Sequence, residues 1–303
     1  MDFELTSDQE ALVSAIDKLA QGFETKPTEF HGFALVSPEL EHELTEGQYF
    51  DIAQIPELGP LAAAMAVERL ARLPCTGEIA LSMLLRPQLR KELPRPFGLI
   101  ENGRPGRFVA SARTVVVIDG ETVSIAQPAA SEVEPVDSLL AYPMGRMREA
   151  VKLTRLSDEE AAGARKWLRI ALAAEASGLL QAAVASAVEH LTLRKQFGRP
   201  LGAFQALRHR MAECAVLAGG VRWLALKAAG TAEEADAALA ALHAQESATR
   251  VAYEVHQMLG AMGMTLEHPL HLWTYRLKAL VAELGGRGGQ ALAVARHCFG
   301  ASV

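Results

Sequence analysis

The sequence is poor in features that would assign it to several large classes of protein. Its 303 residues include only three cysteines, which lie far apart and lack the spacing of a metal site or a disulfide framework. The net charge of -6 gives no overall attraction to nucleic acid. No stretch of about 20 residues is both apolar and uncharged, so we expect no membrane span. The start, Met1–Leu5, lacks the pattern of a signal peptide, and we expect a cytoplasmic protein.

The first part of the chain shows helical spacing of apolar residues. Half of all residues are hydrophobic and 22% are charged, as in globular proteins. The spacing predicts helices over residues 6–23, 58–73 and 77–85. After Pro87 the apolar runs become short and β-branched. Residues 109–119 and 121–125 are predicted to form two strands joined at Asp119-Gly120, which is a hairpin signal.

From about residue 156 the helical spacing returns and continues to the end. It predicts helices over residues 157–194, 202–229, 231–259 and 268–284, and a last one from about 289. These segments are rich in alanine and leucine, which permits close helix packing. The predicted fold is mainly α with a small β insert. We expect an N-terminal helical domain (1–86), a reduced β domain (87–150) and a C-terminal helical bundle (151–303).

One stretch, residues 193–205, places basic residues, a glycine turn and amides between two predicted helices. A guanidinium such as Arg194 at a helix corner can bind a pyrophosphate through paired hydrogen bonds. The alternative is a set of exposed cations that only favour the helix dipole. The stretch resembles the flavin signature R-x-x-F-G-x-x-x-x-x-F-Q of the acyl-CoA dehydrogenase family.

A second stretch, residues 257–269, supports this resemblance. It is similar to the family's motif Q-x-x-G-G-x-G-[FY]-x-x-E-x-P, although Ala261 replaces a glycine and Met264 replaces the aromatic residue. Taken alone, it could be a helix end followed by a glycine turn. In this family FAD is bound at a subunit interface. The resemblance implies FAD contacts from Arg194, Gln196, Phe204, Gln205, Gln257, Gly260 and Ala261. It also implies the family fold, with N-terminal helices, a middle β domain and a C-terminal four-helix bundle.

The catalytic base of the family is absent from both of its usual positions. The family uses a glutamate nine residues after the arginine that corresponds to Arg276, and this position is Gly285 here. The other position lies 26 residues before Arg194 and is Leu168. Glu283 is the remaining candidate for a base. Two residues correspond to about 200° of helix rotation, so its side chain would point away, and it could instead be a solvated carboxylate at a helix end.

Arg169 matches a family arginine that lies near the substrate pocket. It could bind substrate, or it could be an exposed or ion-paired helix residue. It is separated from Arg194 by 25 residues, which is about 37 Å along a helix, so the two cannot share one small site. The family's flavin-ring stretch, A-x-T-E-P-x-A-G-S-D, has no counterpart, and residues 95–100 take its place. The histidines show no ligand pattern, and we expect no metal site.

With these residues missing, the chain resembles the short subunits of actinobacterial heteromeric (α2β2) acyl-CoA dehydrogenases of steroid catabolism. The resemblance implies an enzyme subunit that completes the FAD site of a full-length acyl-CoA dehydrogenase subunit. An acyl-CoA substrate and an electron-transfer flavoprotein or similar acceptor are implied as further partners. Two alternatives remain open. The chain could be a self-sufficient enzyme that uses Glu283 as its base, or a non-catalytic scaffold of the same fold.

Overall fold

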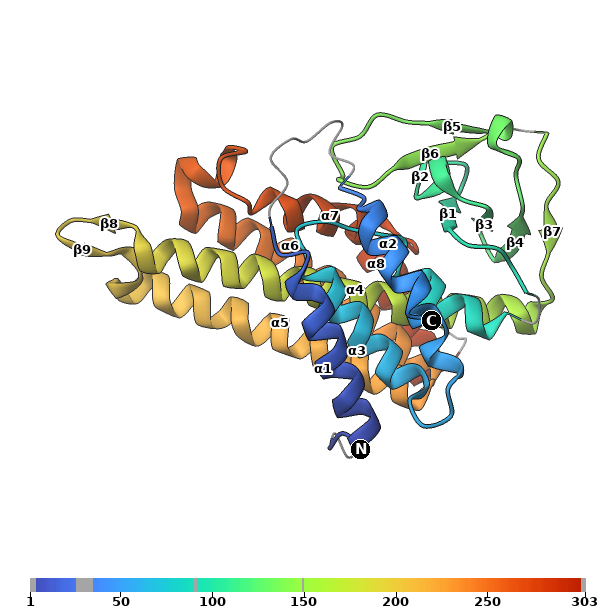
Figure 1. Ribbon diagram of the computed structural model, residues 1–303, viewed down its shortest axis with the longest axis horizontal. Coiled ribbons are helices and arrows are strands. Elements are labelled where there is room, and N and C mark those ends of the chain that lie inside the picture. The colour runs from blue at the N-terminus through green and yellow to red at the C-terminus, as the bar shows by residue number, and fades with distance from the viewer. Residues whose placement is uncertain (1–3, 26–34, 90–91, 149, 301–303) are drawn as a thin grey trace.

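The computed structural model describes residues 4–25, 35–89, 92–148 and 150–300. A long bundle of helices forms one part, and a β region lies beside one end of the bundle (Figure 1). Helices of the N-terminal part lie along the bundle, and the β8–β9 hairpin projects from its far end. The predicted fold class, mainly α with a β insert, is confirmed.

The N-terminal part consists of short helices with clear start signals. Thr6 and Gln9 form a reciprocal capping box at the first helix, and Ser37 accepts a hydrogen bond from the Leu40 amide at the second. The second helix was not predicted, although Ser37-Pro38 is a typical start. The expected helix 77–85 is largely a π-helical turn. The bounds are α1 (Ser7–Gln21), α2 (Pro38–Glu46), α3 (Gly59–Ala71) and the π turn (Leu81–Leu85).

The β region contains two small sheets. The first has the order β1 (Phe97–Glu101), β3 (Thr114–Asp119), β4 (Thr122–Ala126) and β7 (Thr154–Arg155), with β1 and β3 parallel. The second has the order β2 (Gly106–Arg107), β6 (Met144–Met147) and β5 (Val133–Pro135). The β3–β4 hairpin turns at Gly120, as predicted. The predicted strand 109–119 begins only at Thr114, because Phe108 has a φ of 61° and a 3₁₀ turn follows it.

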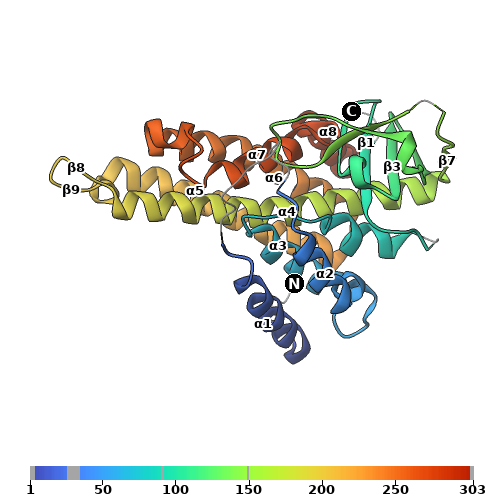
Figure 2. The same ribbon diagram turned by 45° about the horizontal axis from the view of Figure 1, so that its top comes forward.

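The C-terminal bundle follows the predicted helices closely. Its helices are α4 (Asp158–Leu193), α5 (Gln205–Thr231), α6 (Glu234–Leu259), α7 (His271–Ala282) and α8 (Gly286–Phe299), with the hairpin β8 (Lys195–Gln196) and β9 (Arg199–Pro200) after α4. Helix α4 runs through the bundle and packs against α3, α5, α6 and α7 (Figure 2). It is long and apolar enough to cross a membrane, but 78% of its most apolar window is buried inside the protein.

Two contacts fix the N-terminal helices on the bundle. A Cβ atom at Gly178 would lie 2.1 Å from the Glu68 carbonyl oxygen, so glycine allows α3 and α4 to cross closely. The guanidinium of Arg276 is buried and donates hydrogen bonds to the carbonyl oxygens of Leu73 (2.6 Å) and Cys75 (3.2 Å). These carbonyls follow the end of α3, so Arg276 ties α7 to the N-terminal part.

Candidate functional site

The predicted corner at Arg194 is an exposed turn at the end of α4. Arg194 leaves the helix with extended backbone angles, and its amide donates to the His190 carbonyl oxygen at 2.9 Å. Its own carbonyl oxygen accepts from Leu201, which closes the β8–β9 hairpin at its base. Phe197 and Gly198 take positive φ values at the hairpin turn. Arg194 and Gln196 are exposed. The β8–β9 hairpin lies at the far end of the molecule from the β region (Figure 1).

The hairpin rests on Phe204. The guanidinium carbon of Arg199 lies 4.1 Å from the centre of the Phe204 ring, and Phe197 meets this ring edge to face at 6.1 Å. Phe204 is half-buried and supports the hairpin, while Gln205 is exposed at the start of α5. Phe197 is 87% exposed and was not among the predicted site residues. Its place as the aromatic residue of R-x-x-F-G is the signal that would have identified it.

The second predicted motif lies at the edge of a groove. Helix α6 ends at Leu259, Gly260 takes φ 61° and ψ −136°, and a 3₁₀ turn covers Gly260–Met264. Only glycine adopts such backbone angles readily, which explains its presence at this position. Gln257, Gly260 and Ala261 are exposed and line a groove of about 660 Å³ together with residues of α6 and α7.

The two motifs lie at the same end of the bundle. The rings of His190 on α4 and His268 in the segment after the 3₁₀ turn meet edge to face at 5.2 Å. Figures 1 and 2 show the β8–β9 hairpin and the end of α6 on the same side of the molecule. Within the described residues, no hydrogen bond or ion pair engages the side chains of Arg194, Gln196 or Gln257. This set of exposed guanidinium and amide groups suits a phosphate-bearing nucleotide.

Glu283 lies in a buried ion-pair network at the other end of α7. The Nε of Arg107 donates to Glu283 at 2.6 Å, and its Nη1 donates to Glu175 at 2.6 Å. The hydroxyl of Tyr142 donates to the other oxygen of Glu175 at 2.6 Å. Burial raises the pKa of Glu283, and Arg107 opposes this rise. The interpretation of Glu283 as a solvated carboxylate was therefore wrong, because Arg107 on β2 covers it.

A second carboxyl group lies beside Glu283 and was not predicted from the sequence. Glu101 at the end of β1 accepts a hydrogen bond from the Leu284 amide at 2.6 Å. Burial and the neighbouring Glu283 raise the pKa of Glu101 to about 7. Both carboxyls line a cavity of about 390 Å³ that also includes Gly285, the position where the family has its base. Strand β1 was not predicted, so no sequence signal placed Glu101 here.

Arg169 is an ion-paired helix residue in this structure. Its Nε donates to the Gln290 side-chain oxygen at 2.9 Å, and its Nη1 lies 3.7 Å from Glu234. Burial lowers its pKa. Arg169 also lines a cavity of about 330 Å³ next to Glu101, at the opposite part of α4 from Arg194. The structure thus separates these two arginines, as their spacing predicted.

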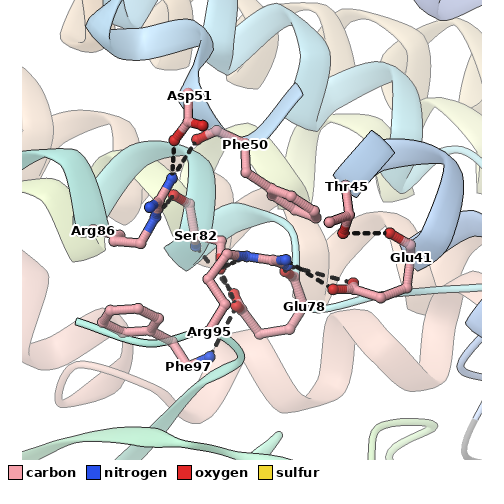
Figure 3. A network of polar contacts seen from close by, with 9 residues as sticks. All are labelled: Glu41, Thr45, Phe50, Asp51, Glu78, Ser82, Arg86, Arg95 and Phe97. Carbon is pink, nitrogen blue, oxygen red and sulfur yellow. Dashed lines mark hydrogen bonds and ion pairs between the residues drawn. The ribbon is translucent and has the colours of Figure 1, made fainter. Parts of the chain in front are cut away.

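The segment in place of the flavin-ring stretch is bound to the N-terminal helices (Figure 3). Arg95 donates to Glu41 (2.8 Å), to the Ser82 hydroxyl (2.7 Å) and to the Glu78 carbonyl oxygen (3.0 Å). The amide of Phe97 donates to the buried Glu78 carboxylate at 2.9 Å. These hydrogen-bond donors are already paired within the segment and the N-terminal helices, so they are not available to a flavin ring. No cluster of metal-binding side chains occurs among the described residues.

Comparisons with known proteins show which family and which folds this chain resembles. Residues 161–299 match the family described as acyl-CoA dehydrogenase, C-terminal domain. The chain is 34% identical over 167 residues to acyl-CoA dehydrogenase IpdE2 of Mycobacterium tuberculosis, covering 53% of this chain and 52% of that protein. The matched region thus spans about half of the length of this relative.

Solved structures are similar over nearly the whole chain. The ChsE4–ChsE5 complex from Mycobacterium tuberculosis matches with a TM-score of 0.78 and 19% identity, over 98% of both chains. A structure described as the Tcur3481–Tcur3483 steroid ACAD matches with a TM-score of 0.79 and 17% identity, over 95% of this chain and 96% of that chain. At these identities the likeness shows the shared fold.

Proposed function

We propose that this chain, whose residues 161–299 match the acyl-CoA dehydrogenase C-terminal domain, is one subunit of an FAD-dependent, hetero-oligomeric acyl-CoA dehydrogenase. The enzyme would introduce an α,β double bond into an acyl-CoA thioester. FAD supplies the hydride acceptor of this reaction. A base must remove the α-proton, and the proposed full-length partner subunit supplies that base and the contacts to the flavin ring.

The residues of this chain would bind the nucleotide half of the cofactor. Arg194 would hold the pyrophosphate, and the amides of Gln196, Gln205 and Gln257 would offer neutral hydrogen bonds. The turn at Gly260 and Ala261 would bring the backbone close to the ligand. Phe204 would contribute indirectly, because its ring packs against the hairpin that carries the polar groups. All of these groups would bind and orient, and none would transfer a proton.

One observation carries the proposal. The exposed polar corner at one end of the bundle lacks partners within the described residues, whereas Glu283, beside the position of the missing base, is already paired with Arg107. A guanidinium held between Glu175 and Glu283 leaves little freedom for Glu283 to accept a substrate proton. The chain therefore offers half of a cofactor site and no base at either family position.

The partner and substrate are proposed from the similar proteins. The ChsE4–ChsE5 structure is described as a complex, and the Tcur3481–Tcur3483 structure is described as a steroid ACAD. We propose an α2β2 heterotetramer with FAD shared at the subunit interface and a bulky, steroid-derived acyl-CoA as substrate. Electron-transfer flavoprotein or a similar protein would reoxidise the flavin. The three free cysteines fit a cytoplasmic enzyme.

Two other functions are considered. A self-sufficient enzyme would use Glu283 as base, and a substitution Glu283→Gln would then abolish turnover. A scaffold would keep the bundle for assembly alone, and FAD content would not depend on Arg194. Arg169 would bind substrate only after release from Gln290 and Glu234.

The test is the amount of FAD per chain. The chain purified alone should hold little flavin, and co-expression with a full-length subunit should yield a coloured, active complex with fewer FAD molecules than subunits. The substitution Arg194→Ala in this complex should weaken FAD binding about 10- to 100-fold, which corresponds to one charged hydrogen-bonding group.

The control is Arg113→Ala, which removes an exposed arginine before β3 at the opposite end of the molecule and should leave FAD bound. A flavin-loaded, active homo-oligomer of this chain would contradict the proposal. Unchanged FAD content in the Arg194→Ala complex would favour the scaffold.

A further inference from the structure

His256 joins the Gly260–Met264 turn to the body of the bundle. It lies in the last turn of α6, directly before Gln257, and its ring points inward while Gln257 is exposed. The ring Nδ1 lies 2.6 Å from the Gly263 carbonyl oxygen, and Nε2 lies 3.0 Å from the Thr274 hydroxyl of α7. One side chain thus connects the turn with both helices that flank the groove.

The chemistry of its partners fixes the proton on Nδ1. A carbonyl oxygen only accepts hydrogen bonds, so Nδ1 must donate to Gly263. Burial, together with the nearby Lys278 and His271 on α7, lowers the pKa of His256, which keeps the ring neutral at pH 7. Nε2 is then an acceptor for the Thr274 hydroxyl at 3.0 Å, and the Leu270 carbonyl oxygen, at 3.2 Å, is a second acceptor for the same hydroxyl. Both ring nitrogens are engaged, so His256 is not available as a proton carrier or a metal ligand.

The turn is held by hydrogen bonds and by packing against α6. The Thr265 amide (3.2 Å) and the Thr265 hydroxyl (3.0 Å) both donate to the Met262 carbonyl oxygen. Gly263 packs tightly against α6, since a Cβ atom there would lie 2.9 Å from the His256 carbonyl oxygen. The hydrogen bond from Nδ1 to the Gly263 carbonyl oxygen adds a side-chain contact from α6 at the point where the turn packs against that helix.

We propose that His256 is a positioning residue for the cofactor: its Nδ1–H bond to Gly263 fixes the Gly260–Met264 turn in the shape that binds the nucleotide half of FAD. This inference rests on the proposed function. A turn fixed before binding loses less conformational entropy when the ligand arrives, so its affinity is higher. Gly260 and Ala261 are exposed residues of this turn and line the same groove as His256.

The test uses two isosteric substitutions in the FAD-containing complex. In His256→Asn the side-chain amide can replace Nδ1–H as the donor to Gly263. In His256→Gln the amide reaches the position of Nε2 instead and cannot replace that donor. We expect FAD to bind about five- to tenfold more weakly in His256→Ala and His256→Gln, from the loss of one hydrogen bond. His256→Asn should remain within about twofold of the parent, since the donor is retained.

A second measurement does not depend on FAD or on assembly. Amide hydrogen exchange of the peptide spanning residues 259–266 is followed in the isolated chain, and we expect faster exchange in the Ala and Gln variants than in the Asn variant. Equal FAD affinity in His256→Ala, or equal losses in the Asn and Gln variants, would overturn the inference. A parent complex that lacks FAD would overturn the proposed function first, and this inference with it.

Discussion

The substitution Arg107→Met tests the buried ion pairs beside the position of the missing base. The side chain of Arg107 is 2% exposed and lies 2.6 Å from both Glu175 and Glu283. Methionine has a similar length and no charge, so it would leave two carboxylates buried without a cation. Removing one partner of a buried pair costs about 3–5 kcal/mol. In a chain of this size we expect a decrease in melting temperature of about 6–15 °C.

The loss should depend on pH in a defined direction. Burial raises the pKa of Glu283, and Arg107 opposes the rise, so removal of Arg107 raises this pKa further. The folded variant then binds a proton that the unfolded chain has already released above its ordinary pKa. Its stability therefore falls as pH increases, and the deficit should be larger at pH 8 than at pH 5. Urea unfolding at both pH values measures the free energy of unfolding.

The control removes the negative charges together with the positive one. A triple variant with Arg107→Met, Glu175→Gln and Glu283→Gln carries no charge at these three positions and should regain at least half of the lost stability. A loss below about 1 kcal/mol in Arg107→Met, or a triple variant no more stable than the single one, would refute the reasoning.

Two further predictions concern stability and come from the same cavity and from the helix crossing. The pKa of Glu101 is raised to about 7, so the folded protein loses stability as pH rises from the unfolded pKa of about 4.5 to 7. The substitution Glu101→Gln should remove this pH dependence of the free energy of unfolding in urea, and it should stabilise the protein above pH 7 by at most about 3 kcal/mol. An unchanged pH dependence would contradict the assignment. Gly178→Ala should destabilise by about 1–3 kcal/mol, because its Cβ would overlap the Glu68 carbonyl oxygen. Gly163→Ala on the same helix has open space and should cost nothing, so equal losses in both variants would refute the crossing argument.

Local patterns were sufficient for most of the helical bundle. The predicted helices 157–194, 231–259 and 268–284 agree with α4, α6 and α7 to within about three residues, which is the usual uncertainty of helix ends. Long periodic segments carry their own signal. The β region was predicted only at the β3–β4 hairpin, because Asp119-Gly120 is a local turn signal. Strand β1 pairs in parallel with β3, and such pairing joins segments without a tight turn that the sequence could reveal.

In the candidate site, too, local motifs were predicted and contacts between distant segments were not. The corner at Arg194 and the turn at Gly260 were predicted because each motif lies within one short stretch and needs only a helix end and a glycine. His256 and Phe197 are in or beside these motifs, but their roles depend on what their side chains contact. Glu101 could not be found, since its environment comes from β1 and from the segment after α7.

The sequence by itself determined the helical fold, the family resemblance and the two exposed corners proposed to bind the cofactor, because helix periodicity and short motifs depend on neighbouring residues. It also determined that Gly285 and Leu168 cannot act as a base. Only the tertiary structure decided the state of Glu283. The sequence treats it as a carboxylate at a helix end, and Arg107, which is 176 positions away in the chain, turns it into one member of a buried ion pair. Burial and charge pairing arise from the packing of distant segments, and no local pattern contains them.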